Sequence, residues 1–473
     1  MCVCDDLPPQ IVVGLQAFVQ RLRDHLRTHR DEPFDVQEQG LLDAWYAERA
    51  GLLTGLVSAA TTGADPQQGR PPRSTCPTCG TTCAAERWRE RTLGTRVGPV
   101  ALNRTVYHCP ACGQRWSRAD QTLGLAPHQR TSTGLAAWEA RQAARTSFAD
   151  AAAAIADLTG VVIGTETMRT HAEQQGAAVE AERQALEAHI EHTQESPPAT
   201  HDPAPGHLVV ETDGVMVRYT CPASCECTDG WHEVKLGIVG GWTGQRPDAH
   251  LTAPSYVAAR ETAATFAPRL GTEATRRGAL DIVGWEQPAG VDPRLAGGTG
   301  PALAVLRPVA VLGDGARWIW EDVAPLFANE RIEIVDWYHA TEHLWDLAKA
   351  LHGIDVAATK AWAESAETVL WQEGGFALLK LLRATTAVSP EAAKVLERER
   401  GYFTRNVLRM QYPLFRQQGL PIGSGAAEGS AKHLVQQRLK RTGAMRWSHA
   451  GAHAILQLRC QLLTHEARPA KAA

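Results

Sequence analysis

The sequence lacks a long apolar run and a secretory signal. No segment has eighteen or more consecutive apolar residues, and the nearest approach, residues 151–164, is interrupted by Asp157. A membrane-spanning helix needs about 20 such residues, so none is predicted. The opening residues, Met-Cys-Val-Cys-Asp-Asp, contain neither the basic region nor the apolar segment of a signal peptide. We therefore expect a cytoplasmic protein in a reducing compartment, without a membrane partner.

The composition excludes further classes. A chain of 473 residues is too long for a disulfide-framework peptide and predicts two to four folded units. Hydrophobic residues at 44% and charged residues at 21% are typical of a soluble globular protein. The eleven cysteines are odd in number, which disfavours a complete set of disulfides and makes metal binding the alternative to examine.

Positive charge is concentrated in two segments. The net charge of −4 argues against a uniformly basic nucleic-acid-binding protein. Residues 70–150, however, contain twelve Arg and no Lys against five acidic residues, a local balance of +7. Residues 429–473 contain eight Lys or Arg against Glu466 alone, again +7. Each segment is a candidate DNA-binding surface, with a solvated basic face as the alternative.

Apolar periodicity indicates how the chain is organised. Residues 9–60 predict two or three amphipathic helices, and residues 61–74 a linker. Three helical segments between residues 135 and 179 have the spacing of a helix-turn-helix, with an Ala-rich helical linker as the alternative. A Pro-rich boundary follows at residues 196–206. Apolar runs then predict strands of one sheet at residues 208–219, 232–242, 309–313 and 332–336, before a helical block at residues 344–418.

Two Cys-x-x-Cys pairs predict a metal site. The pairs, Cys76 with Cys79 and Cys109 with Cys112, are each followed by Gly and are separated by 29 residues that suit the hairpins of a zinc ribbon. Four thiolates predict a tetrahedral zinc site, although iron could occupy the same ligands. Because four protein ligands leave no open coordination position, the metal would be structural.

Other cysteines are weaker candidates. A second cluster, with compressed spacing, could also bind zinc: Cys221, Cys225, Cys227 and His232. We interpret the remaining thiols as bystanders: Cys2, Cys4, Cys83 and Cys460.

Carboxylates inside apolar strands are candidate ligands, because burial of an uncompensated charge is costly. Asp213 lies within the apolar run at residues 208–217, and Asp314 ends the run at residues 309–313. Each precedes a Gly, and a hairpin turn is the alternative for an isolated Asp-Gly. Glu428 opens a predicted helix, where ordinary N-terminal helix charge is the alternative. On that helix Lys432, Val435 and Leu439 share the face of Glu428, so we expect Glu428 to head a stripe facing the sheet.

The order of these segments resembles the DDE transposases of bacterial insertion sequences, most closely the ISKra group. Four ordered blocks carry the resemblance: residues 211–214 (Glu-Thr-Asp-Gly), 313–320 (Gly-Asp-Gly-Ala-Arg-Trp-Ile-Trp), 336–345 (Asp-Trp-Tyr-His-Ala-Thr-Glu-His-Leu-Trp) and 423–447, which begins Gly-Ser-Gly-Ala-Ala-Glu. The similarity is strong over residues 205–460 and looser before them. One departure is Ala444, which lengthens the Gly-Met-Arg-Trp sequence expected there.

The resemblance implies an α/β RNase H-like catalytic domain in which Asp213, Asp314 and Glu428 bind catalytic Mg²⁺ or Mn²⁺. The helical block would be an all-helical insertion in that domain. Asp336 and His339 are similar to an Asp-x-x-His feature of related transposases, with a helix cap and a packing His as the alternative. The implied regions are an N-terminal helical region (1–65), a zinc ribbon (70–130), a helix-turn-helix-like region (131–195), the catalytic domain (205–343 and 421–473) and its insertion (344–420).

Basic residues next to Glu428 are candidates for DNA contact. These accessory residues are Lys432, Arg438, Lys440 and Arg446. Trp447, Trp318 and Trp320 could stack on unpaired bases, with core packing as the alternative.

The sequence therefore predicts a transposase that binds the ends of its element through the zinc ribbon and helical region, cleaves there, and joins the 3′-hydroxyl to target DNA. Its partner would be double-stranded DNA, and because two ends must be held together, a homodimer or larger homo-oligomer is implied. Two other functions remain open. One is a non-catalytic DNA-binding protein, such as a repressor or domesticated transposase, and the other is an RNase H-like nuclease that joins no strands.

Overall fold

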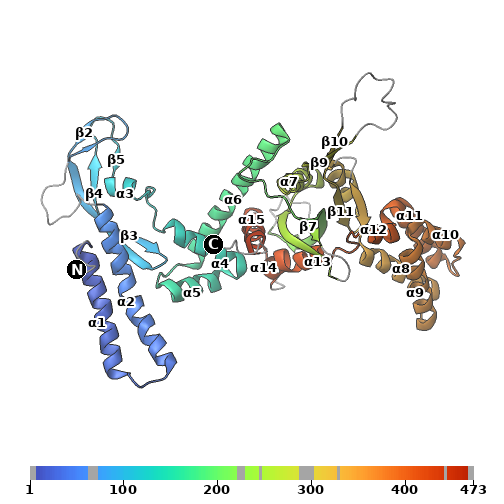
Figure 1. Ribbon diagram of the computed structural model, residues 1–473, viewed down its shortest axis with the longest axis horizontal. Helices are drawn as coiled ribbons and strands as arrows, with labels where there is room; N and C mark the ends of the chain where they lie inside the picture. The colour runs from blue at the N-terminus through green and yellow to red at the C-terminus, as the bar shows by residue number, and fades with distance from the viewer. Residues whose placement is uncertain are drawn as a thin grey trace. The chain divides into compact units, whose positions relative to one another are not determined.

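The computed structural model describes residues 7–61, 73–220, 230–243, 248–286, 303–327, 331–441 and 445–466 (Figure 1). The chain divides into two compact units, Met1–Ala172 and Glu173–Ala473. The first is built from helices and short sheets, and the second contains a five-stranded mixed sheet. Among the described residues, no helix is long and apolar enough to cross a membrane.

The first unit begins with two helices, α1 (Pro9–Thr28) and α2 (Phe34–Ala60), as the periodicity of residues 9–60 predicts. They approach closely at glycines: a Cβ on Gly14 would lie 2.9 Å from a Leu52 methyl, and one on Gly55 would lie 3.1 Å from Ile11. Phe18 and Trp45 pack edge to face across the pair at 6.4 Å. Apolar contact of this kind stabilises the helix pair.

A ribbon of short strands follows. β1 (Ser74–Thr75) pairs with β2 (Thr82–Cys83), while β3 (Ala85–Thr95), β4 (Gly98–His108) and β5 (Arg115–Trp116) form a three-stranded antiparallel sheet. The long β3–β4 hairpin occupies the segment between the two cysteine pairs, where the sequence predicts hairpins. The short helix α3 (Arg118–Thr122) packs beside it.

Three helices close the first unit, and the last of them continues into the second: α4 (Thr133–Arg145), α5 (Phe148–Thr159) and α6 (Thr165–Thr193). Ser132 and Ser147 cap α4 and α5, because each hydroxyl accepts a hydrogen bond from the amide three residues later. Gly160 ends α5 in the left-handed conformation, φ 72°. The predicted three helices are therefore present. Their use in DNA binding stays a prediction.

The sheet of the second unit has the order β12-β11-β6-β7-β8. β6 (His207–Arg218), β7 (Trp231–Thr243) and β8 (His250–Ala259) are antiparallel neighbours. β11 (Val309–Gly313) and β12 (Ile332–Val335) run parallel to β6. The four predicted strands are all present. β8 was not predicted, and neither was the separate hairpin β9 (Ile282–Glu286) and β10 (Leu303–Leu306).

Helices cover both faces of this sheet. Gly237 of β7 lets Leu270 of α7 (Ala263–Arg276) approach, since a Cβ there would lie 2.6 Å from that side chain. Gly237 pairs with Thr212, whereas the adjacent Glu211 faces the other way and contacts α13 (Gly425–Ser430). Successive strand residues point to opposite faces, so α7 and α13 lie on opposite sides.

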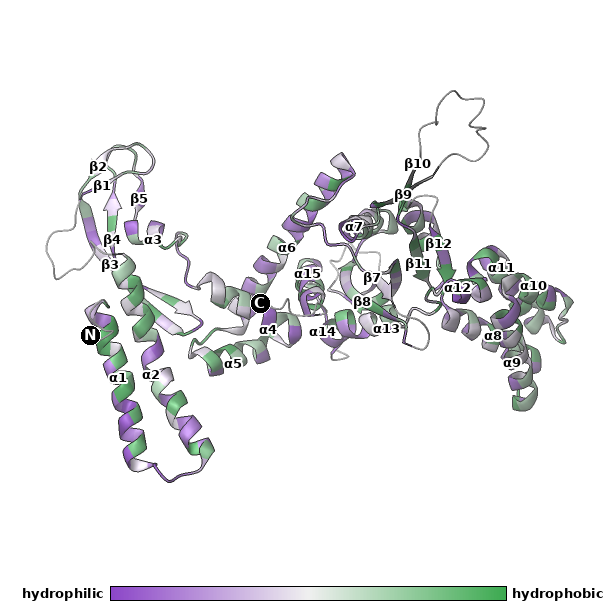
Figure 2. Cartoon of the chain, in the orientation of Figure 1, coloured by the Kyte–Doolittle hydropathy of each residue, from purple (hydrophilic) through white to green (hydrophobic). Residues whose placement is uncertain are grey.

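A helical block, residues 337–417, lies between β12 and α13. Its helices are α8 (Trp337–His352), α9 (Val356–Glu373), α10 (Gly375–Ala384), α11 (Pro390–Asn406), the short 3₁₀ segment η3 (Val407–Met410) and α12 (Tyr412–Gln417). Ser389 caps α11 with Pro390 at its first position, as predicted. Leu344, Leu370 and Phe403 of the block join one apolar core with strands β6 and β11, and the strand β11 appears green, hydrophobic, in Figure 2.

The chain after α13 is irregular. It continues through the π-helical segment η4 (Ala431–Gln436) and α14 (Gln437–Leu439) to α15 (His449–Glu466). Val435 and Leu439 are buried, but Glu428 and Lys432 are exposed. The prediction that Glu428 and Lys432 face the sheet is therefore wrong. The π-helical turn changes the helical phase between these two residues and the buried Val435 and Leu439.

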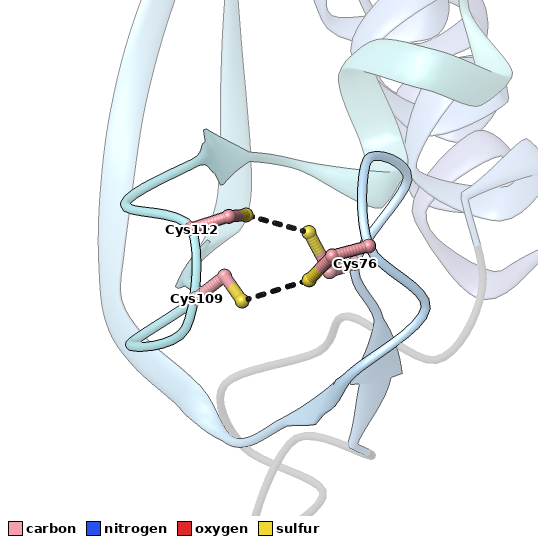
Figure 3. Close-up of side chains that lie close together, drawn as sticks. Cys76, Cys109 and Cys112 are labelled. Carbon is pink, nitrogen blue, oxygen red and sulfur yellow. Dashed lines mark hydrogen bonds between the residues drawn. The ribbon is translucent and has the colours of Figure 1, made fainter.

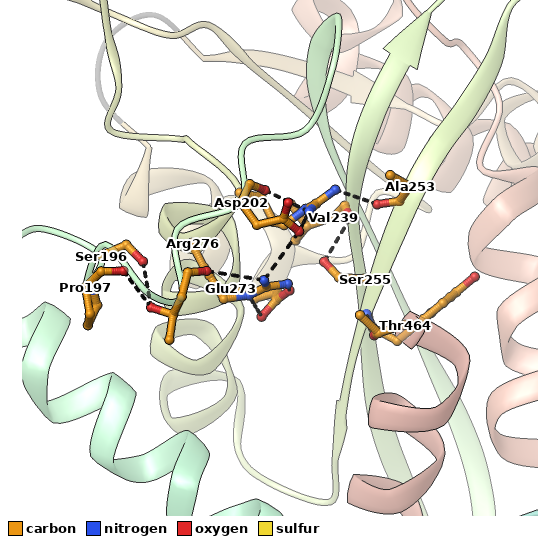
Figure 4. Close-up of polar contacts among 12 residues, drawn as sticks. Ser196, Pro197, Asp202, Val239, Ala253, Ser255, Glu273, Arg276 and Thr464 are labelled. Atoms are coloured by element: carbon orange, nitrogen blue, oxygen red, sulfur yellow. Dashed lines mark hydrogen bonds and ion pairs between the residues drawn. The ribbon is translucent and has the colours of Figure 1, made fainter. Parts of the chain in front are cut away.

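A polar network holds the chain where it enters β6 (Figure 4). The buried Arg277 donates to the carbonyl oxygens of Asp202 at 2.7 Å and Ala253 at 2.6 Å, and the amide of Asp202 donates to Arg276 O at 2.9 Å. Arg276 pairs with Glu273 at 2.6 Å. These bonds border a cavity of about 740 Å³. Their effect is to fix residues 202–205 against α7 and β8.

Candidate metal centre and carboxylate site

The two Cys-x-x-Cys turns have the same backbone geometry. In the first, the amide of Cys76 donates to Thr81 O at 2.9 Å, and the amide of Gly80 donates to Cys76 O at 3.0 Å. In the second, the amide of Gly113 donates to Cys109 O at 2.9 Å. Gly80 (φ 75°) and Gly113 (φ 72°) adopt left-handed conformations that favour glycine. Each turn thereby directs two thiols to one point.

The four sulfurs lie together (Figure 3). The Sγ atoms of Cys76 and Cys112 are 3.6 Å apart, those of Cys79 and Cys109 are 3.4 Å apart, and all four lie within 4.8 Å of one another. Burial alone would raise the pKa of the Cys109 thiol, but hydrogen bonds from the Cys112 amide, the Cys79 thiol and the Ala111 amide together lower it to about 6. The four cysteines can bind a metal such as zinc.

An apolar layer supports this cluster. Cys76 and Cys109 are buried with Tyr107 and Trp116, whose rings stack at 5.4 Å. Cys83 is also buried here, but its sulfur contacts Thr81 O and it does not belong to the four-sulfur group. It is therefore a packing residue, as predicted.

The remaining cysteine predictions have mixed outcomes. Cys460 is buried and has its pKa raised to about 11 by burial, as expected of a packing thiol. His232 is hydrogen-bonded to Arg260 at 3.1 Å. The other members of the second cluster lie outside the described residues, as do two N-terminal thiols: Cys221, Cys225, Cys227, Cys2 and Cys4.

Asp213 and Asp314 come from neighbouring strands. Glu211 of β6 is paired in register with Leu312 of β11, and the strands are parallel, so Asp213 and Asp314 each lie two residues beyond this pair. Asp213 accepts a hydrogen bond from the Gly214 amide at 2.7 Å, and Asp314 accepts one from the Ala316 amide at 2.8 Å. Both are half-buried. The register therefore places Asp213, within β6, beside Asp314, which follows the last residue of β11.

A buried hydrogen bond holds the helix that carries Glu428 against β6. Glu211 Oε2 accepts a hydrogen bond at 2.8 Å from the amide of Ala427, the residue before Glu428. Glu211 is 1% exposed, and burial raises its pKa to about 8. This bond fixes α13 against β6 two residues from Asp213, while the Glu428 side chain is exposed.

The three carboxylates interact electrostatically. The pKa of Asp213 is raised, first by burial and then by the negative charges of Asp314 and Glu428, with His339 acting in the opposite sense. Their oxygens do not all lie within 4.8 Å of one another, since among described residues only the four cysteines form such a group. Carboxylate oxygens are the ligand type that hard divalent cations prefer.

Asp336 and His339 form a neighbouring pair. Asp336 Oδ1 caps α8 by accepting the His339 amide at 2.8 Å, and its Oδ2 accepts the amide and hydroxyl of Ser424, the latter at 2.7 Å. Asp336 is 1% exposed. The Asp336 carboxylate, whose Oδ1 lies 3.7 Å from His339 Nδ1, raises the pKa of His339 to about 9, which favours the positively charged imidazole. Asp336 is therefore a cap and a tether for the segment before Glu428.

The helical block contacts the site through Tyr402. Its hydroxyl donates to Asp314 O at 3.1 Å, and its ring stacks on His343 at 3.8 Å. His343 in turn is hydrogen-bonded to the fully buried Glu399 at 2.6 Å. A Cβ at Gly315, φ 98°, would lie 2.9 Å from the tyrosine hydroxyl, so only glycine fits beside it. Sequence reasoning missed Tyr402, Ser424 and the role of Glu211.

The accessory basic residues divide by exposure. Lys432, Lys440 and Arg446 are exposed. Arg438 is 2% exposed and lies over the Trp447 ring at 4.8 Å, so both are packing residues. The Trp447 indole donates to Leu439 O at 3.2 Å, and its backbone bridges to Tyr219 at the end of β6. Ala444 lies outside the described residues.

The other two tryptophans that were candidates for base stacking, Trp318 and Trp320, also pack within the protein. Trp320 is 9% exposed beneath Arg409, and Trp318 packs edge to face on Phe266 at 6.1 Å.

Comparison with protein-family models and with curated proteins finds no match to this chain.

Proposed function

We propose that the protein is a DDE-type DNA transposase that binds the ends of an insertion sequence and catalyses metal-dependent strand cleavage and strand transfer. The proposal is supported by the parallel register of β6 and β11, which gives Asp213 and Asp314 equivalent positions, and by the Glu211–Ala427 hydrogen bond, which holds the helix of Glu428 against β6. The negative charges of Asp314 and Glu428 raise the pKa of Asp213 further, after the larger effect of burial, and such repulsion between carboxylates favours a bound cation.

The sheet supports an RNase H-like assignment for the second unit. Three antiparallel strands come first in the chain, and two parallel strands then extend the sheet on the side of β6, which is the strand arrangement expected of that fold. The helical block at residues 337–417 stands where an insertion between the last strand and the Glu-bearing helix is expected. Four cysteines beside a hairpin support a zinc ribbon in the first unit.

The site residues would have distinct roles. Asp213, Asp314 and Glu428 would hold Mg²⁺ or Mn²⁺, which when bound activates the attacking oxygen and neutralises the leaving one. Glu211 and Asp336 would keep α13, and with it Glu428, at the sheet edge through their bonds to Ala427 and Ser424. The cationic His339 would offset negative charge there. The exposed Lys432, Lys440 and Arg446 would bind DNA phosphates.

Strand cleavage tests the proposal directly. Purified protein is incubated with element-end duplex and Mg²⁺, with EDTA as the metal-free reaction. Asp213→Asn is expected to lower cleavage at least about 1000-fold while duplex binding is kept, since the metal ligand acts mainly in the chemical step. The matched control is Asp346→Asn, an exposed carboxylate on α8 that pairs with Lys349. Cleavage by Asp213→Asn at the wild-type rate would remove that residue from the site.

Two other functions are separated by the same assay. A non-catalytic DNA-binding protein is favoured by the exposure of Glu428 and the spread of the three carboxylates, and it would bind the duplex without cutting it. A nuclease of similar fold would cut without yielding joined products. Inverted repeats flanking the coding frame, with short target duplications outside them, would favour the transposase. A homo-oligomer that holds two ends is part of the proposal, and size measurement with end DNA bound tests it.

A further inference from the structure

One face of the β3–β4 hairpin is lined with arginine. The cross-strand pairs Arg87 with Val106, Arg89 with Arg104, and Arg91 with Leu102 define this face. Arg89 and Arg104 stand directly opposite each other. Like charges in that position destabilise a sheet unless an anion neutralises them.

Only part of this charge is neutralised within the protein. Asp120 pairs with Arg91 at 3.3 Å and also with Arg104. The side chains of Arg87 and Arg89 are exposed, and within the described part of the chain neither forms an ion pair. Arg91 is 8% exposed and donates to the carbonyl oxygens of Gln129 and Ala126, so among the described residues the accessible, unpaired positive charge of this face is that of Arg87 and Arg89.

The acidic residues of the same strand lie on the opposite face. Glu90 is paired with Asn103, between the arginine pairs, and therefore points the other way. Glu86 is bound to Arg115 at 3.3 Å. The two faces of the hairpin thus differ in charge, and the arginine face is the one suited to a polyanion.

We infer that this arginine face docks the sugar-phosphate backbone of duplex DNA, with Arg87 and Arg89 as the contact residues. The residues that line the face include no aromatic side chain, so it offers no platform on which single-stranded bases would stack. Leu102 and Val106 on this face are buried, so contact with DNA is confined to the two exposed guanidinium groups, which suits phosphate contact rather than entry into a groove. The inference rests on the proposed function only in taking DNA as the partner.

Salt-dependent binding of the full-length, zinc-loaded protein tests the inference. Fluorescence anisotropy with a labelled duplex is measured for the wild type, Arg87→Gln/Arg89→Gln and Arg115→Gln, the last being an exposed arginine of the same sheet that is paired with Glu86. The double variant is expected to bind about tenfold more weakly for each arginine lost. The slope of log K against log salt should fall by about 1.8, because about 0.9 is lost per phosphate contact. Arg115→Gln should match the wild type.

A second variant and a second probe keep the outcomes distinct. Arg87→Lys/Arg89→Lys keeps both charges and should retain most of the salt slope; its loss would overturn a backbone contact. If the Gln double variant binds duplex as the wild type does, the arginine face is wrong while the proposed function stands. If the wild type binds no duplex, both fail. A loss confined to single-stranded DNA or RNA would overturn the duplex assignment. Zinc content of each variant confirms that the ribbon is folded.

Discussion

The four cysteines of the first unit lie within 36 residues of one another in sequence, whereas the three carboxylates of the second unit span 215 residues. The cysteine sulfurs all lie within 4.8 Å, but the carboxylate oxygens do not. Two short turns, each closed by its own backbone hydrogen bonds, are enough to gather thiols. Carboxylates repel one another, so they are held near each other by tethers to the fold rather than packed into a ready-made shell.

The comparison predicts that the two metals affect stability very differently. Cys109→Ser should lose the bound metal and unfold the ribbon, because metal binding at such a site contributes on the order of 10 kcal/mol to folding. Metal analysis and hydrogen exchange of residues 73–122 measure this. Cys83→Ser is the matched control and should keep its metal. A Cys109→Ser protein with full metal content would contradict the assignment.

Chelation gives the complementary result in the second unit. The carboxylate site needs no metal to fold, since its strands belong to an apolar core. Removal of divalent cations should therefore stop cleavage without unfolding strands β6, β7 and β11, as hydrogen exchange would record. Unfolding of that sheet in the absence of magnesium would show that both sites are structural.

The tether at Glu211 is expected to have the next largest effect. Glu211→Leu leaves the buried Ala427 amide without an acceptor, which costs about 1–3 kcal/mol and releases the helix that carries Glu428. Thermal unfolding and cleavage should both suffer. Glu211→Gln keeps an oxygen acceptor of the same shape and should restore both. Equal damage from the two variants would show that a charge, rather than the hydrogen bond, is required.

Relief of repulsion predicts a small gain in stability. Burial and the charges of Asp314 and Glu428 disfavour ionised Asp213, so Asp213→Asn should raise the unfolding free energy by about 1 kcal/mol in metal-free buffer. Thermal denaturation measures the change, with Asp346→Asn as the control. Destabilisation by Asp213→Asn would indicate that the aspartate is held by contacts stronger than the repulsion.

The smallest expected effect concerns Tyr402. Tyr402→Phe removes one hydrogen bond to Asp314 O, worth about 1 kcal/mol, and should slow cleavage about fivefold. Tyr412→Phe is matched to it, because that hydroxyl also donates to a buried backbone carbonyl, Val335 O at 3.0 Å, but to none of the three candidate carboxylate residues. It should lower stability by a similar amount and leave the cleavage rate unchanged.

The sequence predicts the cysteine site more completely than the carboxylate site. The cysteine ligands follow from local spacing, and the strand at Val309–Gly313 is predicted to the residue, since an apolar run ended by Gly-Asp has clear limits. β8 is missed because Pro254 and its alanines weaken the strand signal; proline is tolerated there because β8 is an edge strand. The role of Glu211 cannot be predicted without knowing that the Ala427 amide lies beside it.

The helical block shares its interior with the sheet. Its first residue, Trp337, donates its amide to the carbonyl oxygen of Ile422 at 2.8 Å, five residues beyond the end of the block, so the polypeptide leaves the sheet and returns at almost the same point. The apolar side chains of the block nevertheless continue without a break into those of β6, β11 and β12. Sheet and block are thus thermodynamically inseparable: they should melt in a single transition, and neither should survive as an isolated fragment.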